Sequence, residues 1–408
     1  MSVNRVGLVS LHTSPLAAPG SADAGGMNVY VVALAEALSE RGLEVELLTR
    51  SSSHDDPAIG HTPRGVPVRF LRAGPQEPLP KDDLARHLSA FRDALRALPA
   101  FDLLHSHYWL SGAAALAVAE EQGIPHIQSL HTVAALKNRN LAPGDRPETL
   151  ERIRAEQRLV VDSRLTIAST GAERTAILSG YGADPRSVEV VPPGVDTALF
   201  HPAAAGGPSH ASGIGNAGGG KPIILTLGRI QPLKGQDLAI HTLAAIPAER
   251  RPRLIIAGAP TPGEKKYEKA LKSLVTELGV HDDVKFVGTQ SRAAAAEWMR
   301  VAAVVLLPSH SETFGLVALE AAASATPVIA SRASGMQSSV SDGVSGILLD
   351  SRDPGDWAQT LESLLAQPER LAQLSASALA FGANHSWGAT AETTLGVYRS
   401  ALRPPESQ

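Results

Sequence analysis

The sequence has no cysteine among its 408 residues, and this absence excludes disulfides, thiolate chemistry and cysteine-based metal sites. It has no uninterrupted apolar run of about 18 residues, so we expect no segment that spans a membrane. The stretch from Met1 to Leu11 lacks the apolar core and cleavage site of a signal peptide, which predicts a first strand and a cytoplasmic protein. Basic residues are not in excess, because the formal net charge is −4, and this argues against a nucleic-acid partner.

The length indicates two domains, because 408 residues exceed what one hydrophobic core usually organises. Short apolar strand patterns alternate with helical patterns in both halves, which predicts two doubly wound α/β domains. The expected strands are residues 6–11, 45–48, 66–71, 103–105, 126–130, 165–168 and 188–191, and then 223–227, 254–257, 284–287, 304–307, 328–330 and 347–349.

A stretch rich in glycine, alanine and serine separates the two halves, and its composition is that of a flexible linker. We therefore expect an N-terminal domain over residues 1–200, the linker over 201–221, a C-terminal domain over 222–385, and a C-terminal helix and tail over 386–408.

The stretch from Leu306 to Ala323 reads as a buried strand end, a turn and a helix. At the carboxyl end of a parallel strand a turn faces the ligand crevice, and the next helix directs free N–H groups to the same place. Glu312 in the turn and Glu320 in the helix are suited to accept hydrogen bonds from sugar hydroxyls. The backbone donors suited to hold an anion lie near Phe314, Gly315 and Leu316. The alternative interpretation is two surface glutamates beside an ordinary helix start.

A second loop follows a strand end from Gly228 to Gly235 and carries two cations, Arg229 and Lys234. Arginine offers a planar fork and lysine a point charge, and both are suited to neutralise a leaving diphosphate. Two solvated surface cations are the alternative interpretation.

The first half has its own candidate ligand loop, in which Asp23-Ala24-Gly25-Gly26-Met27-Asn28 lies between a strand and a helical pattern. The glycines let a ligand approach the backbone closely, although a tight turn without a ligand stays an alternative. Their spacing is not the dinucleotide fingerprint, so a nicotinamide cofactor is not indicated.

Three histidines occur at or near strand ends in the first half. His105 and His107 alternate along one strand and share a face, but no third ligand is evident, so we expect no metal site. His131 is suited to bond a ligand, with a satisfied core histidine as the alternative.

The glutamate stretch and the cation loop resemble the retaining GT-B glycosyltransferases, the glycosyl transferases of group 1 with a glycogen-phosphorylase-like fold. A turn glutamate, a Phe-Gly helix start and a second glutamate occur here in that family's order, as do Gly-Arg and then Lys-Gly. The resemblance implies two Rossmann-like domains with an interdomain cleft, the donor nucleotide on the second domain and the acceptor on the first. It also implies that the C-terminal helix packs back on the first domain.

Residues 12–15, 23–31, 105–112 and 131–132 are similar to the mycothiol-pathway branch of this family. That similarity implies retaining transfer of N-acetylglucosamine from UDP-N-acetylglucosamine to 1D-myo-inositol 3-phosphate. The alternatives that stay open are another UDP- or GDP-sugar transferase, of the sucrose-phosphate-synthase or mannosyltransferase kind, and a nucleotide-sugar epimerase or hydrolase on the same fold.

The resemblance also implies roles for individual residues. The catalytic set is Arg229, Lys234, Glu312 and His131. The donor-binding set is Gly26, Arg229, Lys234, Gln290, Glu312, Phe314, Gly315, Leu316 and Glu320, in which Gln290 replaces a frequent arginine. The acceptor-binding set is His12, Asp23, Ala24, Gly25, Gly26, Met27, Asn28, Lys81, Tyr108, Thr132 and Arg152.

The resemblance implies partners and cofactors as well. The partners are a nucleotide sugar and a phosphorylated polyol, and a homodimer stays open. The chemistry requires no cofactor, and a structural magnesium ion held by main-chain carbonyls near Met299 to Ala302 and Thr326 stays an alternative.

Overall fold

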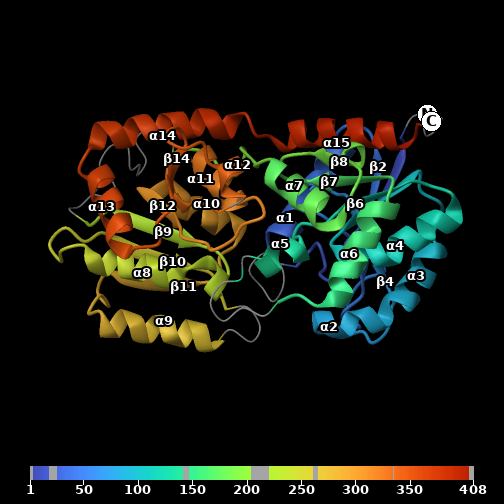
Figure 1. The fold of residues 1–408 in the computed structure, drawn as a ribbon, viewed down its shortest axis with the longest axis horizontal. Coiled ribbons are helices and arrows are strands. Elements are labelled where there is room, and N and C mark those ends of the chain that lie inside the picture. The colour runs from blue at the N-terminus through green and yellow to red at the C-terminus, as the bar shows by residue number, and fades with distance from the viewer. Residues whose placement is uncertain are drawn as a thin grey trace.

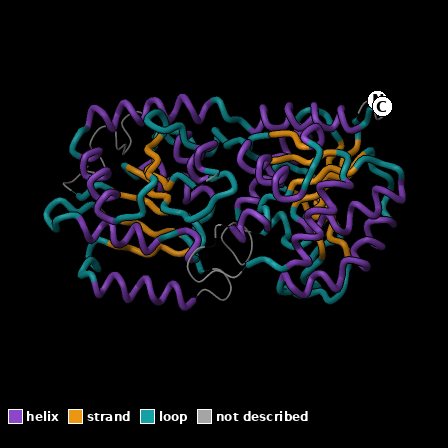
Figure 2. The backbone as a smooth tube through the Cα atoms, in the orientation of Figure 1, coloured by secondary structure: helices purple, strands orange, loops and turns teal. Residues whose placement is uncertain are grey.

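Two α/β units lie side by side along the long axis of the molecule (Figure 1), each with strands at its centre and helices outside (Figure 2). The structure is a computed structural model that describes residues 3–17, 25–139, 141, 147–203, 220–260, 265–333 and 335–403. Within those ranges no helix is long and apolar enough to cross a membrane.

The first unit is built on an eight-stranded sheet with the order β3-β4-β2-β1-β5-β6-β7-β8. All neighbouring strands are parallel except β3 and β4. The strands are β1 (Arg5–Val9), β2 (Glu44–Arg50), β3 (Ile59–His61), β4 (Pro67–Leu71), β5 (Leu103–His107), β6 (His126–Ser129), β7 (Leu165–Ala168) and β8 (Val188–Val190). Because β1 pairs with both β2 and β5, the strand order reverses there, and a ligand crevice is expected at the carboxyl ends of these strands.

The second unit has six parallel strands in the order β11-β10-β9-β12-β13-β14, with its reversal between β9 and β12. The strands are β9 (Ile223–Leu227), β10 (Arg253–Ala257), β11 (Val284–Gly288), β12 (Val304–Leu307), β13 (Val328–Ser331) and β14 (Gly346–Leu349). Each expected strand therefore exists, and both doubly wound sheets are confirmed.

Helices cover the sheets. Those of the first unit are α1 (Gly26–Ser39), α2 (Lys81–Leu84), α3 (Leu88–Arg96), α4 (Trp109–Gln122), α5 (Ala134–Arg139), α6 (Leu150–Asp162) and α7 (Gly171–Tyr181). Those of the second are α8 (Gln236–Ala245), α9 (Lys265–Glu277), α10 (Arg292–Val301), α11 (Leu316–Ala323), α12 (Met336–Ser339), α13 (Pro354–Leu365) and α14 (Pro368–Ala383), and the last helix is α15 (Trp387–Ala401).

The edge strand β3 is the one strand that sequence patterning missed. Its residues Ile59-Gly60-His61 are largely exposed and pair antiparallel with β4 alone. An exposed three-residue edge strand has no buried face, so it leaves no periodic apolar pattern to find.

The helix α15 returns to the first unit and packs on α1 (Figure 1). Its residues Trp387, Leu395 and Tyr398 are buried in one apolar core with Leu34 and Leu38 of α1. The apolar face of α15 therefore lies on the unit in which the chain began.

The chain crosses between the units twice, and the two crossings touch. The Val195 N–H donates to the His385 carbonyl oxygen at 2.8 Å, and the Thr390 hydroxyl donates to the Pro192 carbonyl oxygen at 2.9 Å. A Cβ on Gly194 would lie 2.3 Å from the Trp387 nitrogen, so only glycine allows this approach.

Candidate active site

The loops after β9 and β12 are bonded to each other where the strand order of the second sheet reverses. The His310 N–H after β12 donates to the Leu233 carbonyl oxygen after β9 at 2.9 Å. Arg352, which follows β14, donates from Nη1 to the Pro308 carbonyl oxygen at 3.0 Å. Gly235 has φ of +66°, and a Cβ there would lie 2.2 Å from the Pro308 carbonyl oxygen. Glycine is therefore required for the two loops to meet.

This meeting brings Lys234 and Glu312 together, two of the predicted catalytic residues. Lys234 Nζ bonds Glu312 Oε1, which also accepts a hydrogen bond from the Ser309 hydroxyl at 3.1 Å. The Gly335 N–H donates to the Glu312 carbonyl oxygen at 3.0 Å and fixes the turn. The lysine ammonium and the glutamate carboxylate therefore lie at the same strand ends.

The start of α1 in the first unit faces the second unit. A Cβ on Gly25 would lie 3.8 Å from Arg229 Nε, and one on Gly26 would lie 3.6 Å from Leu316 Cδ1. The structure thus brings these predicted residues from both units to one place. Asp23 and Ala24 lie outside the described residues.

The helix start around Gly315 is shaped by its neighbours. Gly315 has φ of +90°, and a Cβ there would lie 2.8 Å from Met336 Sδ and from the Ser339 hydroxyl. Phe314 is 4% exposed and packs in the core of the second unit. The main-chain N–H groups of this turn, rather than the phenyl ring, are therefore the ligand-binding candidates.

Glu320 is 7% exposed and pairs with Arg292, whose Nη1 lies 2.8 Å from Oε1. Burial raises the pKa of Glu320, and the charge of Arg292 partly offsets that rise. Arg292 was not among the residues predicted from the sequence, which placed the nearby Gln290 in the donor-binding set.

The side chain of Gln290 is engaged within its own loop. Its Nε2 donates to the Val287 carbonyl oxygen at 2.8 Å, and its Oε1 accepts from Trp298 Nε1 at 3.1 Å. Gln290 therefore shapes the loop between β11 and α10, and the cation beside Glu320 comes from two residues further along the chain.

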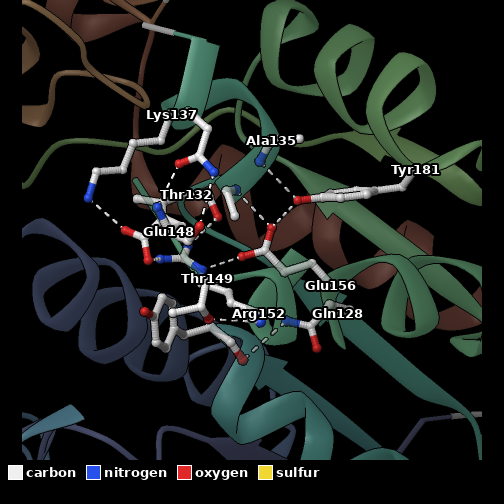
Figure 3. Close-up of polar contacts among 12 residues, drawn as sticks. Gln128, Thr132, Ala135, Lys137, Glu148, Thr149, Arg152, Glu156 and Tyr181 are labelled. Carbon is white, nitrogen blue, oxygen red and sulfur yellow. Dashed lines mark hydrogen bonds and ion pairs between the residues drawn. The ribbon is translucent and has the colours of Figure 1, made fainter. Parts of the chain in front are cut away.

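Three side chains from different parts of the first unit surround Tyr108. Lys81 Nζ lies 5.7 Å and Arg152 Cζ 4.8 Å from the centroid of the Tyr108 ring, and the His12 ring lies at 4.3 Å. Arg152 Nη2 donates to the Thr132 hydroxyl oxygen at 2.7 Å (Figure 3). The structure therefore assembles five of the predicted acceptor residues.

The remaining acceptor candidates that the structure describes have other contacts. Asn28 is 2% exposed, and its Nδ2 donates to the Ser14 carbonyl oxygen at 2.8 Å and to the Thr13 hydroxyl at 3.1 Å. Met27 packs against two apolar cores of the first unit. The Asn28 side chain thus holds the loop after β1 in place, and the Met27 side chain is part of the apolar packing.

His131 has φ of +61° and is bonded within a histidine cluster rather than isolated. Its Nε2 lies 2.9 Å from His107 Nδ1, and His105 Nδ1 lies 2.7 Å from the Tyr398 hydroxyl of α15. Burial lowers the pKa of His131 to about 3, so this ring is neutral at pH 7. It can give a ligand a hydrogen bond but no positive charge.

Within the described residues, no group of three histidine, aspartate or glutamate side chains could hold a metal ion. The Thr326 hydroxyl donates to the Met299 carbonyl oxygen at 2.6 Å. The Met299 carbonyl oxygen, one of the main-chain groups expected to hold magnesium, therefore has one partner within the protein, and we derive no step through a metal.

Comparisons with known proteins agree with this architecture. Residues 24–199 match the family described as Glycosyltransferase Family 4, and residues 212–380 match Glycosyl transferases group 1. The D-inositol 3-phosphate glycosyltransferase of Kineococcus radiotolerans is 44% identical, with 98% of this chain and 96% of that protein covered. The enzyme of that name from Frankia alni is also 44% identical, with 97% and 99% covered.

Solved structures share the fold. The sucrose-phosphate synthase of Thermosynechococcus elongatus has a TM-score of 0.87 and 28% identity, with 97% of this chain and 98% of that chain covered. Anabaena HepE in complex with UDP-glucose has a TM-score of 0.77 at 20% identity, with 98% and 100% covered, and shows the fold alone. The expected GT-B architecture and the family resemblance are both confirmed. The chain therefore belongs to the group 1 glycosyltransferases of GT-B fold.

Proposed function

We propose that this protein transfers N-acetylglucosamine from UDP-N-acetylglucosamine to 1D-myo-inositol 3-phosphate with retention of configuration. The names of the relatives from Kineococcus radiotolerans and Frankia alni support this acceptor. The observation that carries it is the pair of cations around Tyr108, because Lys81 and Arg152 together suit a phosphate monoester.

On the donor side, Arg229 and Lys234 stabilise the departing diphosphate, which is where negative charge develops. Glu320 accepts hydrogen bonds from the ribose. Glu312 and the N–H groups that follow it orient the sugar, at the start of α11 where the helix dipole favours negative charge.

The inositol hydroxyl attacks the sugar C1 from the same face of the ring from which the diphosphate departs. The bond from the sugar C1 to the diphosphate oxygen breaks, and a bond from C1 to an inositol oxygen forms. The hydroxyl proton moves to the leaving phosphate oxygen, and UDP departs. Neutral His131 donates or accepts one hydrogen bond beside the sugar and supplies no proton, in keeping with its lowered pKa.

UDP release by the purified protein tests this function. With UDP-N-acetylglucosamine as donor, we expect rapid release with inositol 3-phosphate and little with myo-inositol or without acceptor. Fructose 6-phosphate and GDP-mannose in the same assay test the other transferase alternatives. Equal release without any acceptor would instead indicate a hydrolase.

Replacing Gly235 by alanine should disrupt the donor site. Gly279→Ala is the matched control, because Gly279 has φ of +65° with nothing within 4 Å of a Cβ. Both variants bear the cost of a left-handed alanine, about 1 kcal/mol. Only Gly235→Ala also forces a Cβ against the Pro308 carbonyl, so we expect a larger fall in Tm and about tenfold weaker UDP binding by calorimetry. Equal behaviour of the two variants would refute the steric argument.

A further inference from the structure

The carboxylate of Glu148 lies between the side chains of Lys137 and Arg152 (Figure 3). Its Oε1 is 2.6 Å from Lys137 Nζ, and its Oε2 is 3.0 Å from Arg152 Nη1. Lys137 comes from α5, whereas Arg152 comes from α6. One anionic group thus bridges a lysine and the arginine assigned to the acceptor phosphate.

The other donors of Arg152 are held by partners within the fold. Its Nε lies 2.6 Å from Glu156 Oε1, and its Nη2 donates to the Thr132 hydroxyl and carbonyl oxygens at 2.7 and 3.1 Å. Glu156 is fully buried and also accepts hydrogen bonds from the Tyr181 hydroxyl at 2.5 Å and the Ala134 N–H at 2.9 Å. Displacement of the Glu156 carboxylate would leave the Tyr181 hydroxyl and the Ala134 N–H without their acceptor, which is costly.

Unlike the fully buried Glu156, the Glu148 side chain is accessible to solvent. It is 22% exposed, whereas its partner Arg152 is 5% exposed. The main chain of Glu148 is anchored separately. Its N–H donates to Asn138 Oδ1 at 2.7 Å, and Asn138 Nδ2 donates to its carbonyl oxygen at 3.1 Å. The carboxylate can therefore leave Arg152 while the backbone on either side stays in place.

We propose that the Glu148 carboxylate occupies the position of the acceptor phosphate in the ligand-free protein, and that the phosphate displaces it and binds Lys137 as a further cation. This inference rests on the proposed function, which assigns the acceptor phosphate to Arg152. Lys137 is then a substrate-binding residue, and Glu148 sets the affinity for the phosphate by competing with it.

The charges at this place favour the exchange. The Glu148 carboxylate brings one negative charge to Lys137 and Arg152, whereas a phosphate dianion brings two. Lys81 adds a third cation beside the Tyr108 ring. Phosphate also offers three acceptor oxygens where a carboxylate offers two, so it can bond more of these donors.

The ionised form of Glu148 is the competing form. Partial burial raises its pKa, but the charges and hydrogen bonds of Arg152 and Lys137 outweigh this and hold the pKa of Glu148 below its usual value. The competitor is thus charged throughout the pH range in which the phosphate is a dianion.

The test compares Glu148→Gln and Lys137→Met with Glu151→Gln, a neighbouring exposed glutamate in the first turn of α6. We expect Glu148→Gln to lower KM for inositol 3-phosphate about threefold to tenfold, the worth of a partly buried ion pair. We expect Lys137→Met to raise that KM and Glu151→Gln to leave it unchanged, with KM for the donor unchanged in all three variants. An unchanged or raised acceptor KM in Glu148→Gln would overturn the inference.

Binding of inorganic phosphate, measured by calorimetry, separates this inference from the proposed function. Tighter phosphate binding by Glu148→Gln than by wild type supports the exchange even where inositol 3-phosphate is not turned over. Equal or weaker phosphate binding by Glu148→Gln contradicts the exchange even where the wild type is active. The melting temperature of each variant shows whether it is folded. Lys137→Arg keeps the positive charge and should restore the acceptor KM that Lys137→Met raises.

Discussion

Acidification from pH 7 to pH 5 is expected to destabilise the protein, because several histidines are kept neutral by burial, and three of them lie deep in the core. His105, His107 and His126 are at most 2% exposed, and burial lowers the pKa of each, to about 3 for His126. In the unfolded chain each takes up a proton as the pH falls through about 6.5, whereas the folded chain excludes it. Their stabilisation is therefore complete above pH 6.5 and is lost as the pH falls towards the folded pKa.

The expected loss is about 2 kcal/mol for each histidine over these two pH units, or about 6 kcal/mol for these three. His12 and His131, whose pKa values burial also lowers, add to it. Glu173 has the opposite effect, because burial raises its pKa to about 7. Its ionised form destabilises the folded state above that pH, and protonation on acidification restores about 2 kcal/mol of stability. The net loss of at least about 4 kcal/mol is a large part of typical stability.

Urea unfolding at pH 7, 6 and 5 measures this loss. His126→Gln should flatten the pH dependence by about one proton, whereas Glu173→Gln should steepen it. His54→Gln is the control, because His54 is exposed and should leave the pH dependence unchanged. A free energy of unfolding that is the same at pH 7 and pH 5 would contradict the neutral burial of these rings.

Lys234→Ala should reduce kcat about 100-fold to 1000-fold, which is the usual effect of removing one group that stabilises transition-state charge. The variant removes an ammonium group that bonds Glu312, so it also leaves that carboxylate without this cation. Because the diphosphate charge grows as the bond to the sugar breaks, we expect kcat to fall more than KM rises.

Lys221→Ala is the matched control. Lys221 lies just before the amino end of β9, whereas Lys234 follows the carboxyl end of that strand. The Lys221 ammonium bonds Asp283. Its removal should leave kcat within about twofold of wild type, because the amino end of the strand is remote from the proposed site. A Lys234→Ala enzyme with near-normal kcat would show that leaving-group stabilisation lies elsewhere.

The sequence was sufficient for the architecture because its strands are short apolar runs that differ sharply from the helices between them. Each buried strand could be predicted for this reason, whereas the exposed β3 could not. The positions of the donor loops could also be predicted, because Arg229, Lys234 and Glu312 each follow a predicted strand. Carboxyl ends of neighbouring parallel strands must meet, so proximity followed from order along the chain.

Pairings between side chains of different elements could not be predicted from the sequence. Nothing in the local pattern shows that Glu148 would bridge Lys137 and Arg152, because the pairing depends on how α5 and α6 approach each other. In α6, Arg152 is buried and the nearby Arg154 is exposed. The helical period can separate two such neighbours, but it does not reveal the partner that holds Arg152.

The same limit applies to the second unit. Arg292 reaches Glu320 across 28 positions of sequence, and its guanidinium lies 5.0 Å from the centroid of the Phe200 ring. No periodicity links these three residues. Only the packing of α10, α11 and the crossing segment brings them together.

The most direct test of the proposed function is to isolate the product formed from UDP-N-acetylglucosamine and 1D-myo-inositol 3-phosphate and determine its anomeric configuration by NMR. We predict one product, in which N-acetylglucosamine is joined to inositol phosphate with the α configuration of the donor retained. A β-linked product would refute the retaining mechanism, and free N-acetylglucosamine as the only sugar product would refute the transferase itself.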